Sequence, residues 1–235
     1  MSYSGGQVAY GCEQLAKLGL TKLDWGNVSI KEFDSVYIKP SGFKCDEVRD
    51  FEVVEYNTTK NKIVSDHKLK PSVDLPMHLE IYKAIPEVKA IAHFHSEYAT
   101  IWAQAGRDIP CLGTTHADVF GHEHVFCTPT PNKFENYEAE LGKDAARWLI
   151  NGEGKLISAV LLACHGAVVV STKDVYDLLD KAVALEEVAK MAYKTRMLAK
   201  NLDCQGELFR DNRQEVYKFH YERKHGENKY YGQQD

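Results

Sequence analysis

The sequence lacks closely spaced cysteines. No Cys-x-x-Cys motif occurs, and the six cysteines are spread along the chain at Cys12, Cys45, Cys111, Cys127, Cys164 and Cys204. Such scattered spacing is not typical of a disulfide framework. We expect the thiols to be reduced and buried, as in a cytoplasmic protein.

Long apolar runs are also missing. No stretch of about 18 apolar residues, the length needed for a membrane-spanning helix, is present. The first ten residues, MSYSGGQVAY, have neither the basic start nor the apolar stretch of a secretory signal. These absences predict a cytoplasmic location and no membrane partner.

Neither repeats nor a strong excess of charge is present. The net charge of −5 at pH 7 argues against a nucleic-acid partner, because such partners attract positively charged proteins. With 235 residues, the chain is long enough to bury a core without disulfide support. We expect one domain over residues 1–235.

Segments with helical and strand periodicity alternate along the chain, which predicts an α/β fold. Helices are expected at residues 6–18, 74–84, 96–105, 135–150 and 174–199. Strands are expected at 25–30, 35–38, within 48–66, and at 88–95, 156–163 and 168–170. Residues 113–122 are predicted to form a polar loop. Ser96 and the Ser171-x-x-Asp174 pattern are expected to cap the helices that follow them.

The clearest local motif is a pair of histidines, His93 and His95, at the end of an apolar strand. Side chains two residues apart on a strand point to the same face, so both rings can reach one ion. His165 also follows an apolar strand. Three histidines with an open fourth position are typical of a catalytic zinc site.

Simpler explanations of these histidines remain open. A His-x-His pair is common in ordinary strands, and a single histidine is often a satisfied core residue. A second pair, His122 and His124, lies in a polar segment where a solvated surface role is expected. The histidines alone therefore indicate a metal site without specifying a reaction.

A short segment suited to anions lies at Lys39-Pro40-Ser41-Gly42. It combines a cation, a hydroxyl group and a glycine, and backbone N–H groups beside such a glycine can form an anion-binding nest. Asn27 and Ser72 are expected to add donors. Each of these features alone is more often an ordinary turn.

Longer motifs include Trp25-Gly26-Asn27-Val28-Ser29, Ile38-Lys39-Pro40-Ser41-Gly42 and His93-Phe94-His95-Ser96. These motifs resemble those of a known superfamily, the class II aldolases and epimerases. Others are similar to its L-ribulose-5-phosphate 4-epimerase branch, namely Ala99-Thr100-Ile101-Trp102-Ala103-Gln104-Ala105-Gly106, Gly113-Thr114-Thr115-His116-Ala117-Asp118, and the tail from Arg223-Lys224-His225-Gly226 to Tyr230-Tyr231-Gly232-Gln233. The resemblance extends from about residue 6 to the C-terminus.

The resemblance implies a fold and a set of site residues. The fold is α/β, a single class II aldolase-like domain with a central, mainly antiparallel sheet flanked by helices and a catalytic C-terminal tail at about 210–235. The metal is Zn²⁺, or another divalent ion such as Mn²⁺ or Co²⁺. Its implied ligands are His93, His95, His165 and Asp74. The residues implied to bind substrate or its phosphate are Asn27, Lys39, Ser41, Gly42, Ser72, Thr115, His220 and Arg223.

The implied reaction interconverts L-ribulose 5-phosphate and D-xylulose 5-phosphate. The hydrogen on C4 is not acidic, so the configuration is inverted by retro-aldol cleavage of C3–C4, rotation of glycolaldehyde phosphate and re-addition. Negative charge develops on the other fragment, where a divalent cation acts as a Lewis acid. Proton transfer is needed on both faces of C4, and the resemblance assigns it to Asp118 and Tyr231.

The resemblance also implies a homotetramer of C4 symmetry with active sites between subunits, in which a neighbour anchors the tail that carries Tyr231. Two departures occur: Val73 replaces a serine often used beside the phosphate, and residues 122–155 differ from the better-known epimerases. Two alternatives remain: an aldolase of the fuculose-phosphate type, which has glutamate where this chain has Asp74, and a non-catalytic module like the adducin head. Arabinose and ascorbate degradation are both open as pathways.

Overall fold

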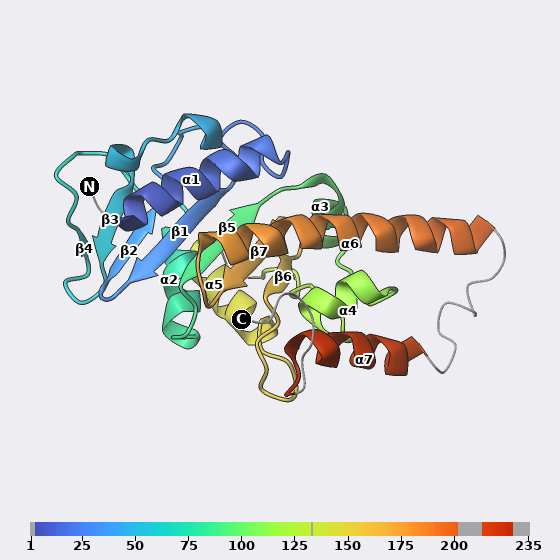
Figure 1. Cartoon of the computed structure of the whole chain (residues 1–235). Coiled ribbons are helices and arrows are strands. Elements are labelled where there is room, and N and C mark those ends of the chain that lie inside the picture. Colours follow the sequence, from blue (N-terminus) through green and yellow to red (C-terminus); the bar gives the residue numbers. More distant parts are fainter. Residues whose placement is uncertain (1–2, 133, 202–212, 228–235) are drawn as a thin grey trace.

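A seven-stranded sheet forms the centre of the protein (Figure 1). The structure is a computed structural model and describes residues 3–132, 134–201 and 213–227. All neighbouring strands are antiparallel, in the order β4-β3-β2-β1-β5-β7-β6. The strands are β1 (Asn27–Glu32), β2 (Ser35–Ile38), β3 (Val54–Asn57), β4 (Lys62–Ile63), β5 (Ala90–Phe94), β6 (Ala159–Leu162) and β7 (Gly166–Ser171). The expected antiparallel sheet is thereby confirmed.

Helices cover both faces of this sheet. The α-helices of the described residues are α1 (Tyr3–Lys17), α2 (Leu75–Ala84), α3 (Glu97–Gln104), α4 (Thr114–Phe120), α5 (Tyr137–Trp148), α6 (Val175–Asn201) and α7 (Arg213–His225). One core lies between the sheet and α1, α3 and α6, and a second lies between the sheet and α2 and α5. The fold therefore has three layers.

Strand β5 lies near the middle of the sheet and is buried on both faces. Ala90, Ala92 and Phe94 contribute to the core under α1, α3 and α6, whereas Ile91 contributes to the core under α2 and α5. Because side chains alternate along a strand, His93 faces the same side as Ile91. This places the imidazole on the side covered by α2 and α5.

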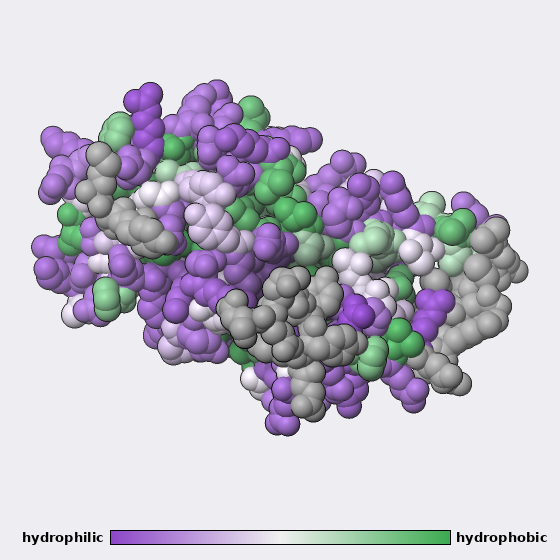
Figure 2. Space-filling model, in the orientation of Figure 1, coloured by the Kyte–Doolittle hydropathy of each residue, from purple (hydrophilic) through white to green (hydrophobic). Residues whose placement is uncertain are grey.

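Helix α6 continues well past the edge of the sheet, α4 packs against it there, and α7 packs against α4 (Figure 1). Eight residues near helical spacing form the buried face of α6: Val175, Leu178, Leu179, Ala182, Leu185, Val188, Ala189 and Ala192. The outer half also exposes Met191, Met197 and Leu198. Figure 2 shows hydrophobic side chains on the visible face where α1 approaches α6 and toward the end of α6.

The prediction of a loop at 113–122 is wrong, because residues 114–120 form α4. This helix has β-branched threonines in its first turn and no side-chain cap, so local propensity does not favour it. Its inner face is buried, and Ala117 packs with Tyr217 of α7 and Cys111. Tertiary packing therefore stabilises a helix that the sequence pattern does not reveal.

Two predicted helix caps also differ from the observed ones. Asp174 caps α6, because its Oδ1 accepts the Asp177 N–H at 2.9 Å, whereas Ser171 belongs to β7 and its hydroxyl donates to Asp177. Ser96 does precede α3 but makes no side-chain cap hydrogen bond. Residues 50–52 form a 3₁₀ turn rather than part of a strand.

The prediction that all cysteines are buried is wrong for Cys164, which is exposed, and Cys127 is only half-buried. Cys204 lies outside the described residues. None of the described helices has the length and apolar character needed to cross a membrane. That the whole chain forms one domain stays a prediction.

Candidate functional site

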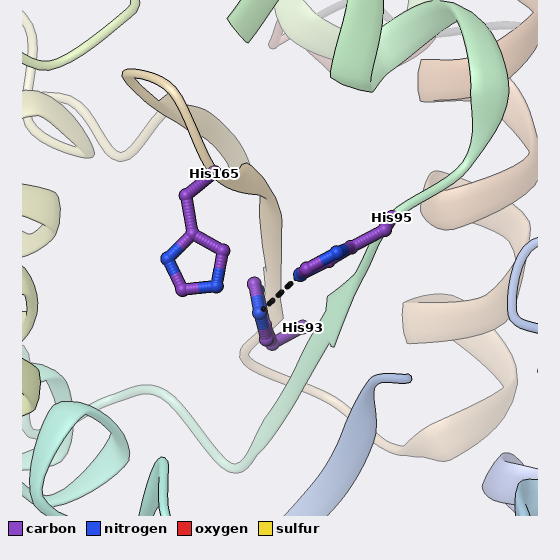
Figure 3. A group of neighbouring side chains, drawn as sticks. All are labelled: His93, His95 and His165. Carbon is purple, nitrogen blue, oxygen red and sulfur yellow. Dashed lines mark hydrogen bonds between the residues drawn. The ribbon is translucent and has the colours of Figure 1, made fainter. Parts of the chain in front are cut away.

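Three imidazole rings meet at one end of β5. His93 lies on the strand, His95 lies just beyond it, and His165 lies in the turn between β6 and β7, and the three rings point toward one another (Figure 3). The ring centroids are 4.8–5.0 Å apart, and one nitrogen from each ring lies within 4.8 Å of the other two. The His93–His95 pair and His165, which the sequence indicated separately, therefore come together in the structure.

Antiparallel pairing explains why His165 reaches the other two. Strand β7 pairs directly with β5, so that Phe94 lies opposite Ala167. The turn before β7 thus lies beside the end of β5. Its residue Cys164 has a left-handed φ of 62°, a conformation common in short hairpin loops. This turn presents His165 to the space above His93.

Two glycines allow the close approach of backbone to these rings. A side chain at Gly166 would come within 2.7 Å of the His95 ring carbon Cδ2. At Gly26, where φ is +100°, it would come within 2.7 Å of the His93 carbonyl oxygen. The Trp25-Gly26-Asn27 motif and the glycine after His165 are therefore steric requirements of the histidine group.

The three imidazoles are neutral at physiological pH. Burial lowers the pKa of His93 to about 4 and also lowers the pKa of His95 and of His165. The His93 Nδ1 lies 3.0 Å from the Ala167 carbonyl oxygen, which only accepts hydrogen bonds. In a neutral ring Nδ1 therefore carries the proton, and Nε2 presents a lone pair toward His95.

These donors fit a divalent cation. The Nε2 atoms of His93 and His95 are 3.1 Å apart, close to the roughly 3.3 Å expected for two imidazoles on one tetrahedral zinc with Zn–N distances of about 2.0–2.1 Å. A metal-ligating histidine typically donates its other N–H to a carbonyl group, as His93 does to Ala167. The group can therefore hold a metal ion.

Asp74 lies at the rim of this group, directly before α2. The set of ligand atoms within 4.8 Å of one another contains the three histidines and not Asp74. Its Oδ2 accepts a hydrogen bond of 2.6 Å from Asn27. Burial alone would raise the pKa of Asp74, but nearby imidazoles, chiefly His93, and the Asn27 amide outweigh it and lower that pKa. Asp74 is therefore a carboxylate at neutral pH.

The predicted anion-binding residues line the same cavity as the histidines. This cavity has a volume of about 290 Å³. Its lining includes His93, His95, His165, Asp74, Asn27, Lys39, Ser41, Gly42, Ser72 and Val73. Ser72 N–H donates to the Lys39 carbonyl and Ser41 N–H donates to the Lys70 carbonyl, each at 2.9 Å, which joins the two predicted segments into one wall.

Lys39 is held more tightly than a mobile surface lysine. Its side chain is buried, and Nζ donates to the carbonyl oxygen of Phe43 at 2.5 Å and to those of Asp24 and Pro40 at 3.4 Å. The ammonium group thus clamps the loop that surrounds Gly42. This group brings positive charge to the wall of the cavity, while its N–H protons are hydrogen-bonded to carbonyl oxygens of the loop.

A second group of predicted residues lies elsewhere, between α4 and α7. Asp118 Oδ1 is 3.4 Å from His220 Nδ1, and its Oδ2 is 3.7 Å from an Arg223 guanidinium nitrogen. Thr115 is exposed beside a groove against α6. None of these four residues lines the histidine cavity within one chain. Tyr231 lies outside the described residues.

The profile of the Class II Aldolase and Adducin N-terminal domain family matches residues 6–193. The chain belongs to this family. A relative named as a probable L-ribulose-5-phosphate 4-epimerase, UlaF of Mycoplasma pneumoniae, is 39% identical over 228 residues, covering 93% of this chain and 90% of the relative.

Solved structures show that the class II aldolase fold is shared. An L-fuculose 1-phosphate aldolase superposes with a TM-score of 0.76 at 24% identity, over 94% of this chain and 97% of its own. A sugar-phosphate aldolase from Thermotoga maritima has a TM-score of 0.67 at 22% identity, over 83% and 95% of the two chains. The expected fold is confirmed.

Sequence reasoning missed Tyr137 and Glu138, which also line the cavity. They begin α5, within the segment that departs from the better-known epimerases. The Tyr137 ring is nearly parallel to that of His165, with centroids 6.5 Å apart. Helical periodicity predicted α5 itself, but no motif marks its first turn, so only the packing of α5 on the sheet reveals these side chains.

The remaining histidines have other surroundings. His78 is buried on α2, and its Nδ1 lies 2.6 Å from the Ser29 hydroxyl, which in turn lies 2.8 Å from the Tyr82 hydroxyl. It is thus a core histidine one turn behind Asp74. His124 lies 3.7 Å from Asp108, with half of its side chain exposed, which is the surface environment predicted for the His122–His124 pair.

Acidification is expected to destabilise the protein through His116 on α4. Burial lowers the pKa of His116 to about 4, whereas in an unfolded chain it is about 6.5. Between these values the unfolded state binds more protons, so the free energy of unfolding falls as the pH falls. Proton binding to His116 in the unfolded state lowers the free energy of unfolding by about 2 kcal/mol between pH 6.5 and 5.

Urea unfolding of the wild type and of His116→Phe at both pH values measures this contribution. The phenylalanine keeps a ring beside Phe120 but does not titrate, so the variant should lose about 2 kcal/mol less stability than the wild type. Equal losses in the two proteins would contradict the assignment.

Proposed function

We propose that this protein is a metal-dependent L-ribulose-5-phosphate 4-epimerase, which interconverts L-ribulose 5-phosphate and D-xylulose 5-phosphate. The observation that carries the proposal is the cavity in which three neutral imidazoles face an anion-binding wall built by Lys39, Ser41 and Ser72. The relationship to a protein named as such an epimerase, over nearly all of both chains, supports the choice of substrate.

The residues of the cavity have separate roles in this proposal. The Ser41 and Ser72 hydroxyls and the charge of Lys39 bind the phosphate, so the cleaved aldehyde fragment stays in place while its carbonyl turns. The three histidines hold a divalent ion, with Zn²⁺ favoured by three imidazole donors. When bound, that ion supplies Lewis-acid stabilisation of negative charge on the substrate.

Asp74 and Asn27 orient groups near the ion. The Asn27 amide donates to Asp74 at 2.6 Å, which fixes the carboxylate as a hydrogen-bond acceptor at the edge of the cavity. A carboxylate so placed adds negative charge beside the histidines, favouring a cation there. A glutamate would extend farther into a cavity of only about 290 Å³.

Proton transfer is assigned to Asp118 and Tyr231. Asp118 lies beside His220 and Arg223, outside the histidine cavity of its own chain. We therefore propose that a second copy supplies the α4–α7 group, within a homotetramer of C4 symmetry. A heterologous contact of this kind closes into a ring and pairs one copy's histidines with the next copy's Asp118.

The proposal is tested by incubating the metal-loaded protein with L-ribulose 5-phosphate and measuring D-xylulose 5-phosphate. Conversion is expected, with loss after chelator treatment and recovery when Zn²⁺, Mn²⁺ or Co²⁺ is restored. Accumulation of dihydroxyacetone and glycolaldehyde phosphate would instead indicate an aldolase. No turnover by protein with bound metal would contradict both enzyme assignments and favour a binding module.

A further inference from the structure

The carboxylate of Glu186, on α6, caps the helix that follows the histidine strand. Its Oε2 accepts the Ser96 hydroxyl at 2.6 Å and the Ala99 N–H at 3.0 Å, and its Oε1 accepts the Tyr98 N–H at 2.9 Å. Two of these donors are N–H groups of the first turn of α3, where a negative charge also interacts favourably with the helix dipole. Glu186 thus takes the capping role predicted for Ser96.

This cap is directly connected to the histidine group. Ser96 follows His95 in the chain, is almost fully buried, and has an extended backbone with φ −66° and ψ 153°. Its hydroxyl is anchored to Glu186. The anchor therefore restrains the backbone at the point where the chain leaves β5 and His95 turns toward His93.

Such a restraint matters because His95 forms a wall between two cavities. One is the histidine cavity; the other, of about 410 Å³, is lined by His95, Glu186, Trp25 and Tyr98 among others. Because His95 also lines this second cavity, its ring has space into which it can move if the backbone is not fixed. A metal site loses affinity when one ligand can swing away.

We infer that Glu186 is a positioning residue of the metal centre, which acts through Ser96 to hold the His95 ring within reach of His93 and His165. The inference rests on the proposed metal site and adds to it a residue of α6, a helix that contributes none of the three imidazoles. On this inference, the contact between α6 and the start of α3 supports the metal ligand His95.

Zinc affinity, measured by competition with a chromogenic chelator, tests this inference. Glu186→Ala is expected to weaken zinc binding by about 10–100-fold, the usual effect of removing an outer partner of a metal ligand. Glu186→Gln retains one acceptor oxygen for Ser96 and Ala99 but places an amide group against the Tyr98 N–H, so a loss of about tenfold or less is expected. Glu187→Ala, which removes an exposed neighbour paired with Lys190, should bind zinc like the wild type.

A second variant separates positioning from general stabilisation. The Trp102 indole N–H donates to the Ala189 carbonyl at 3.0 Å, which ties α3 to α6 without contacting Ser96. Trp102→Phe should lower the urea midpoint of the metal-free protein and leave the zinc affinity within about twofold. Ser96→Ala should weaken zinc binding. The double variant with Glu186→Ala should lose less binding free energy than the sum of the two single losses, because both changes remove the same Ser96–Glu186 hydrogen bond.

The outcomes distinguish this inference from the proposed function. If the wild type binds zinc tightly and Glu186→Ala binds it equally tightly, Glu186 is only a helix cap and the inference is wrong. The same conclusion follows if Trp102→Phe and Glu186→Ala weaken zinc binding alike. If the wild type itself fails to bind zinc or another divalent ion, the proposed metal site is wrong.

Discussion

Replacing His95 by alanine is expected to weaken metal binding and to slow turnover sharply. Its Nε2 lies 3.1 Å from the Nε2 of His93, so the change removes one of three converging donors. Affinity for zinc should fall by more than about 100-fold, since the loss of an outer-shell partner alone costs about 10–100-fold. Turnover at saturating substrate should fall on the order of 10³-fold, corresponding to about 4 kcal/mol of Lewis-acid stabilisation.

His95 is a better position for this test than His93. His93 is buried, and its Nδ1–H hydrogen bonds to the Ala167 carbonyl of β7, so its replacement by alanine would also leave a void in the protein interior. The matched control is His124→Ala, which removes a half-exposed ring from the chain's other His-x-His sequence. Metal content and turnover are measured on both variants. Wild-type turnover by metal-depleted His95→Ala would contradict a metal-dependent reaction.

Asp118→Asn is expected to lower kcat by about 10²–10⁴-fold, the usual contribution of a general acid or base. The amide is nearly the same size, so the contacts with His220 and Arg223 on α7 lose charge but little packing. Because the interaction is made in the transition state, kcat and kcat/KM should fall equally. Asp144→Asn, which alters an acid paired with Arg147 on α5, is the control and should retain wild-type kinetics.

Mixing inactive variants tests whether Asp118 serves a neighbouring subunit. If each site combines the histidines of one copy with Asp118 of the next, co-expressed His95→Ala and Asp118→Asn chains should recover about one quarter of wild-type activity, since one quarter of the junctions in a randomly mixed ring carry both intact groups. Absence of recovery in mixed oligomers would show that each chain acts alone. Recovery requires assembly, so oligomeric state is measured on the same samples.

Local patterns predicted most of the elements because periodicity is a property of neighbouring residues. Helix α6 spans Val175–Asn201, close to the predicted 174–199, and β2 occupies the predicted residues 35–38. Helix α4 was missed because its residues favour a helix only once Ala117 packs with Tyr217, about one hundred residues later in the chain. The cap of α3 was misassigned for the same reason, since Glu186 comes from a different helix.

The site likewise combines features set by local spacing with features set by the packing of distant residues. The two-residue repeat of a strand is sufficient to place His93 and His95 on one face. Strand-end position and turn composition singled out His165 and the anion-binding segments, the resemblance of longer motifs gave them roles, and the structure brings all of these to one cavity. Roles in catalysis for Asp118 and Tyr231 stay predictions, since one lies outside that cavity and the other outside the described residues.

By itself, the sequence determined the class of fold, the family and the residue types of the metal centre, because these depend on local spacing and on motifs that can be read along the chain. Only the tertiary structure decided which groups meet. Pairing of β7 with β5 delivers His165, the packing of α5 adds Tyr137 and Glu138, and α6 delivers Glu186. These contacts join residues far apart in sequence, and their energy comes from burial and hydrogen bonds that do not exist until the layers have packed.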